Sequence, residues 1–99
     1  MIAEDRERFE REYGCTAHEW RRWMPAATGG HACTDDATTL RVPIGEGALT
    51  LNWQPLPPRV IALMRLPRLA VQFEFDNVPF TDRREFLRRF DLHLQRGGG

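Results

Sequence analysis

The sequence contains no lysine, so arginine carries its basic charge. Fourteen arginines balance fourteen Asp and Glu residues, and the formal net charge at pH 7 is zero. The chain therefore lacks the strongly basic balance that is typical of nucleic-acid-binding domains. Charge is uneven, however: residues 1–57 hold nine acids and six arginines, whereas residues 58–99 hold eight arginines and five acids. This asymmetry favours attraction between the two halves within one fold.

Long hydrophobic runs are also missing. No apolar run approaches the ~20 residues that span a bilayer, and residues 1–6 run into charge instead of the apolar core of a secretory signal. We therefore expect a cytoplasmic protein with no membrane partner. The two cysteines are then expected to be reduced or metal-bound, and a disulfide between Cys15 and Cys33 is the less favoured alternative.

The length and the apolar content favour one domain. A chain of 99 residues leaves no room for a separate catalytic module, and its three tryptophans and six phenylalanines can supply a core. We expect a single domain over residues 1–96, followed by a frayed glycine tail over residues 97–99.

Two helices are expected near the amino terminus. Residues 3–13 place acids four positions before arginines, the favourable order in a helix. Thr16 and Glu19 then match a capping box, which predicts a short helix over residues 17–24. Pro25 is expected to end this helix, because proline disfavours helical geometry at the residue before it.

Alternation of apolar and polar residues predicts strands over residues 40–44, 49–53 and 69–75. Gly45-Glu46-Gly47 joins the first two as a hairpin. Residues 59–66 are ambiguous, since the run Val60–Met64 is apolar on both sides. We favour a central strand buried on both faces, with a short helix as the alternative.

A final helix is expected after Asn77, capped by Thr81 or Asp82. Its apolar stripe comprises Phe86, Leu87, Phe90 and Leu94. The expected fold class is thus α+β: two N-terminal helices, a three- or four-stranded antiparallel meander, and a C-terminal helix packed on one face of the sheet.

Four residues offer a candidate metal site. They are Cys15 and His18 and, after a gap of twelve residues, His31 and Cys33. Two thiolates and two imidazoles form a donor set that suits tetrahedral zinc, so zinc is the one cofactor that the sequence suggests. The structural alternative is that Cys15, directly before the helix cap, packs as a small apolar residue against the helix. This alternative is favoured because the spacing is not that of a standard zinc site.

Two further functions have some support in the sequence. A cysteine nucleophile beside a histidine, Cys15 with His31 or Cys33 with His18, would give a cysteine-dependent enzyme, but no family signature surrounds either cysteine. Arginines in the second half, Arg84 and Arg88 above all, could bind phosphates in a nucleic acid, although nearby acids neutralise part of that charge.

The sequence therefore favours a small non-enzymatic domain that binds a protein partner or forms a homo-oligomer. A zinc-stabilised nucleic-acid-binding module is the main alternative, and a cysteine-dependent enzyme is the weaker one. The partner itself is not indicated by any motif.

Overall fold

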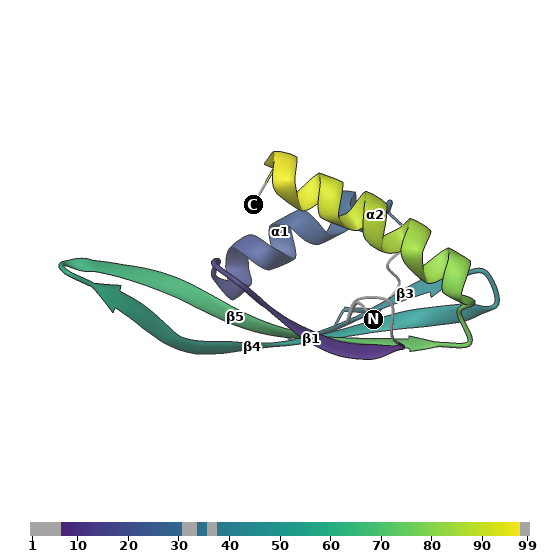
Figure 1. The fold of residues 1–99 in the computed structure, drawn as a ribbon, viewed down its shortest axis with the longest axis horizontal. Coiled ribbons are helices and arrows are strands. Elements are labelled where there is room, and N and C mark those ends of the chain that lie inside the picture. The colour runs from purple at the N-terminus through teal and green to yellow at the C-terminus, as the bar shows by residue number, and fades with distance from the viewer. Residues whose placement is uncertain (1–6, 31–33, 36–37, 98–99) are drawn as a thin grey trace.

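The computed structural model describes residues 7–30, 34–35 and 38–97 (Figure 1). One antiparallel sheet has the strand order β1-β5-β4-β3-β2, and both helices lie over the same face of it (Figure 1). The α+β class and the C-terminal helix packed on the sheet are therefore confirmed. The elements, in chain order, are β1 (Arg8–Tyr13), α1 (Ala17–Ala27), β2 (Thr34–Asp35), β3 (Thr39–Ile44), β4 (Gly47–Ile61), β5 (Met64–Asp76) and α2 (Phe80–Gly97).

The prediction of two N-terminal helices is wrong, because β1 stands where the first helix was expected. β1 pairs with β5 from Arg8 opposite Glu74 to Tyr13 opposite Leu69. Phe9 is buried and its ring stacks on Phe73, with ring centroids 4.7 Å apart. Acid–arginine pairs on a helix surface contribute only ~0.2–0.5 kcal/mol each, whereas burying a phenylalanine contributes ~1.5–3 kcal/mol. Strand pairing therefore prevails over local helix propensity.

Helix α1 begins with the predicted capping box. Thr16 accepts a hydrogen bond from the backbone N–H of Glu19 (3.1 Å), and the Glu19 carboxylate accepts one from the backbone N–H of Thr16 (2.9 Å). The helix continues beyond Pro25 to Ala27, so the predicted end at Pro25 is wrong. Pro25 is exposed, and the Thr28 hydroxyl caps the last turn by donating to the carbonyl of Met24 (2.7 Å). The helix therefore continues for two residues after the proline.

The predicted hairpin is confirmed as β3 and β4, which pair from Ile44 opposite Gly47 to Thr39 opposite Asn52. The turn between them places Gly45 at φ 59°, a left-handed conformation that glycine adopts without steric cost. β2, β3, β4 and β5 follow one another as a meander, and β1 adds to the free edge of β5. The predicted strand over residues 69–75 is the inner part of β5.

The core lies between the sheet and the two helices. On α2, Leu87, Phe90 and Leu94 are buried and Phe86 is half-buried, as the sequence predicts. α2 begins at Phe80, so Asp82 lies inside its first turn instead of capping it. Of the predicted glycine tail, Gly97 is the last residue of α2, and residues 98–99 lie outside the described part. Neither described helix is long and apolar enough to cross a membrane.

Candidate binding site

The outer half of the β4–β5 hairpin projects beyond the rest of the sheet (Figure 1). β1 accompanies β5 only as far as Leu69, and β3 accompanies β4 only as far as Asn52. Farther out, the two strands pair only with each other, up to Ile61 opposite Met64. We call residues 55–68 the arm. Among the residues that the structure describes, no helix or third strand lies beside the arm along most of its length, and most of its side chains are exposed.

The arm corrects the prediction for residues 59–66. These residues form strand and turn instead of a short helix, but the run Val60–Met64 is not buried between neighbouring strands. It makes up the tip, with Ala62 and Leu63 in the turn. Ala62 adopts φ 54°, a left-handed conformation that costs a residue with a side chain ~1–2 kcal/mol.

Apolar side chains concentrate at this tip. The described residues include seven exposed large hydrophobics, and five of them lie within residues 60–66. Their exposed fractions are Leu63 100%, Val60 61%, Met64 61%, Ile61 52% and Leu66 36%. Scattered exposed apolar residues are normal, but a contiguous group marks an interaction site.

The tip is apolar on both faces of the hairpin. Paired residues in an antiparallel ladder share a face, and successive residues alternate between faces. Ile61 and Met64 form one pair and lie on one face, whereas Val60 lies on the other, opposite Arg65. Leu63 projects from the turn. A partner must therefore surround the tip to cover it, because a flat surface would contact only one face.

Prolines make the arm unsuited to strand addition. Pro55, Pro57 and Pro58 lie in β4 and Pro67 lies in β5. A proline has no N–H to donate to a neighbouring strand, and prolines on edge strands block edge-to-edge pairing. The register of the hairpin also shifts between Leu56 and Arg59. The arm thus presents side chains, and its backbone edges are protected.

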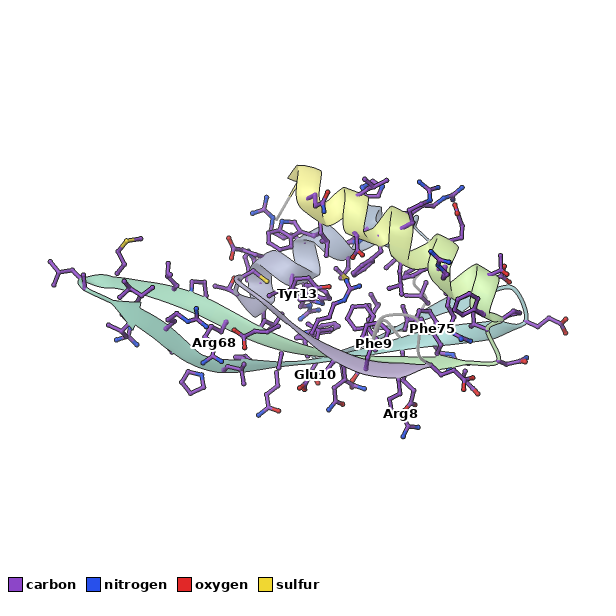
Figure 2. All side chains as sticks on the ribbon, viewed as in Figure 1. Arg8, Phe9, Glu10, Tyr13, Arg68 and Phe75 are labelled. Atoms are coloured by element: carbon purple, nitrogen blue, oxygen red, sulfur yellow. The ribbon has the colours of Figure 1, made fainter. Side chains whose placement is uncertain are left out.

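The arm carries three arginines and no acid over residues 55–68. Arg68, labelled in Figure 2, lies at the base of the arm. It pairs with Glu12 of β1 through two hydrogen bonds of 2.9 Å, which hold the base of the arm against that strand. The hydrogen bond from Arg68 lowers the pKa of Glu12. Arg59 and Arg65 lie nearer the tip and form no ion pair with any described residue. The free charge beside the apolar tip is therefore positive.

The structure locates only half of the candidate metal site. Cys15 is buried in the core, where desolvation, followed by the charge of Glu19, raises the pKa of its thiol to about 11. His18 is exposed in the first turn of α1. His31 and Cys33 lie outside the described residues, so their convergence with Cys15 and His18 stays a prediction. Residues 7–30, 34–35 and 38–97 contain no group of three or more His, Cys, Asp or Glu side chains that could hold a metal ion.

The two arginines predicted to bind nucleic acid lie on the first half of α2. Arg88 binds Glu85 (2.8 Å), and Arg89 binds the same carboxylate (3.1 Å). The guanidinium of Arg84 lies over the ring of Phe80, 5.6 Å from its centroid. Both predicted arginines thus have intramolecular contacts, and part of the basic charge of this helix is neutralised locally.

The arm was missed because an apolar run is usually buried. The prolines on both sides of the run, together with Arg59 and Arg65 at its ends, were the available signal. Residues that border a buried strand seldom combine several prolines with charges so close to the apolar run.

Comparisons with protein-family models and with curated proteins found no match to this chain.

Proposed function

We propose that this protein is a non-enzymatic protein-binding domain whose binding element is the arm. The observation that supports this proposal is the group of five exposed apolar side chains at the end of a projecting hairpin. Exposed apolar surface of this kind is costly in water, and a partner that covers it recovers that free energy.

The size of the effect is adequate for specific binding. Fully burying one large aliphatic side chain contributes ~1.5–3 kcal/mol, so three or four of them offset a good part of the ~4–15 kcal/mol lost in association. The hairpin is already formed, which reduces the ordering cost. Methionine and arginine are both enriched in protein interfaces, and the tip presents Met64 beside Arg65. We therefore expect a partner site with an apolar pocket and a rim that includes acids.

Photo-crosslinking tests this function. Benzoylphenylalanine at position 63 should give a discrete protein–protein adduct on irradiation of cells that produce the variant. The same group at position 92 is the control, because Leu92 is also exposed but belongs to α2 and not to the arm. Equal adducts from both positions, or no protein adduct from position 63, would contradict the proposal.

A second candidate is binding to a nucleic acid, and the lack of acids over residues 55–68 is what favours it. Proteins that enter the minor groove combine arginines with apolar wedges, and Arg59 and Arg65 border such a wedge here. This reading predicts salt-dependent retention on DNA or RNA that falls when both arginines are replaced by alanine. Replacing Arg84 and Arg88 tests the prediction made from α2 in the same assay.

The zinc hypothesis has its own test. Native mass spectrometry of protein purified without added metal counts bound zinc directly. A mass that includes one zinc ion, lost on replacing His31 and Cys33, would support the site. A metal-free mass with unchanged folding would remove it.

A further inference from the structure

A cavity of about 650 Å³ lies at the end of the sheet opposite the arm tip. It is bounded by the end of α1, by the turn between β3 and β4, and by one face of α2. Its apolar lining includes Ala27, Val42, Ile44 and Phe86. The volume lies within the ~300–1,000 Å³ that is usual for binding pockets. The cavity is thus large enough to take several side chains of a partner.

Acidic groups adjoin this apolar lining. Asp82 and Glu85 line the cavity from α2, where Arg89 and His93 continue the same helical stripe. Glu85 binds both Arg88 (2.8 Å) and Arg89 (3.1 Å), so its charge is already neutralised within α2. Asp82, in the first turn, adds a negative charge next to the apolar lining. An apolar pocket bordered by the carboxylate of Asp82 complements an apolar tip that carries arginines.

A single molecule cannot bring its own tip and cavity together. The turn after Ile44 lies at one end of β4, and Ala62 follows its other end. Fifteen residues of strand at ~3.3 Å each separate these points by ~50 Å, in agreement with the longest dimension of the molecule, 47 Å. Only another molecule can place an arm in this cavity.

We propose that the arm of one copy of this chain inserts into the α1–α2 cavity of a second copy. Ile61, Leu63 and Met64 enter the cavity and pack against Ile44 and Phe86, the partly exposed residues of its apolar lining. Arg59 and Arg65 then lie on the side of the cavity that carries Asp82. This inference rests on the proposed protein-binding function and names its partner.

The contact joins two different surfaces and is therefore heterologous. Two molecules that exchange arms reciprocally close into a dimer, whereas head-to-tail insertion builds a ring or a longer chain. The prolines of the arm make pairing of strand edges the unfavourable alternative. The stoichiometry follows from the measured mass.

Sedimentation velocity on the full chain is the first test. Masses above the 11.5 kDa monomer should appear as the concentration is raised. Leu63→Asp should weaken self-association by about 30-fold or more, as loss of a central apolar contact does. Leu63 is fully exposed, so the variant folds, which circular dichroism checks. Leu92→Asp is the matched control and should associate as the unmodified chain does.

Mixing two defective variants tests the cavity. Ala26 lines the cavity from an exposed position on α1, so Ala26→Trp should fill the space and leave the arm intact. Leu63→Asp has the reverse defect, with an intact cavity. Each variant alone should be weakened, whereas the mixture should form a one-to-one pair through the one intact arm and the one intact cavity. Self-association that Ala26→Trp leaves unchanged would overturn the assignment of the cavity.

The crosslink at position 63 separates this inference from the proposed function. An adduct of two copies supports both. A monomer at every concentration, with an adduct to a different protein, overturns the second-copy inference and leaves the protein-binding function standing. Retention on DNA alone, or on anionic lipid vesicles alone, with no protein adduct, overturns both.

Discussion

Replacing Arg11 by alanine should lower the free energy of unfolding more than most other substitutions of a polar or charged residue in this chain. Arg11 lies on the core side of β1, and its guanidinium contacts the carboxylate of Asp91 on α2 at 2.6 and 3.3 Å. It also lies over the rings of Phe9 and Phe73, 5.5 and 5.3 Å from their centroids. Burial by itself lowers the pKa of Arg11, but hydrogen bonds with Asp91 and Tyr13 outweigh it and raise that pKa, so the charge persists at all working pH values.

The magnitude follows from these contacts. Hydrogen bonds to a charged group contribute ~1.5–3 kcal/mol, and a cation–π contact adds ~0.5–1 kcal/mol. The side chain of Asp91 is 39% exposed, so water can solvate its carboxylate once Arg11 is removed. The expected loss of stability therefore lies at the lower end of the summed range. We expect the free energy of unfolding of Arg11→Ala to fall by about 2–3 kcal/mol. The melting temperature should then fall by roughly 10–20 °C.

Urea unfolding followed by tryptophan fluorescence measures this loss, and the same strand supplies the control. Arg8 pairs with Glu74 at 2.9 Å, but both side chains are more than half exposed. Arg8→Ala should therefore cost less than about 1 kcal/mol. A double-mutant cycle with Asp91→Ala should give a coupling above about 1 kcal/mol. A loss of similar size for Arg8→Ala and Arg11→Ala, or no coupling to Asp91, would refute the reasoning.

Four further outcomes are expected. Gly47→Ala should lower the free energy of unfolding by more than about 2 kcal/mol, because the added methyl would overlap the backbone carbonyl of Asn77; chemical denaturation measures it. In a Cys33→Ser background, iodoacetamide should label Cys15 at least about 100-fold more slowly in the folded than in the unfolded chain, since burial raises its pKa from 9.0 to about 11. The same raised pKa means that the stability contributed by the protonated thiol is complete below about pH 9 and is lost as the pH rises through about 11. Ala62→Gly should relieve the left-handed turn and raise the protection of the arm amides in hydrogen exchange, whereas unchanged protection would contradict strain at that position.

Local signals in the sequence were sufficient for several elements. The capping box at Thr16 places the start of α1, because its hydrogen bonds form between residues three apart. The alternation around Gly45 places the β3–β4 hairpin, and the spacing of Leu87, Phe90 and Leu94 places the buried stripe of α2. The capping box and the hairpin depend on contacts within a short stretch of chain. The apolar stripe of α2 requires only that one face of the helix be buried, whichever element covers it.

The candidate functional sites could be predicted from the sequence only in part. Cys15 is buried, which agrees with the interpretation that it packs as a small apolar residue. His31 and Cys33, the other two proposed metal ligands, lie outside the described residues, so the zinc site stays a prediction. Arg84 and Arg88 are predicted to bind phosphates, with part of their charge neutralised by nearby acids. The structure shows which groups they contact: Arg88 binds Glu85, and Arg84 lies over the ring of Phe80. The cavity beside α2 could not be inferred at all, because its lining comes from segments far apart in the chain.

By itself, the sequence determined the fold class, the start of α1, the hairpin and the core face of α2. Only the tertiary structure decided two matters on which the proposed function depends. Residues 8–13 form a strand because they pair with the open edge of β5 and thereby bury Phe9. Local propensity cannot predict this, because β5 lies far away in the sequence. The run Val60–Met64 is exposed because β1 and β3 both stop short of it, and whether neighbouring strands reach an apolar run is a property of the sheet.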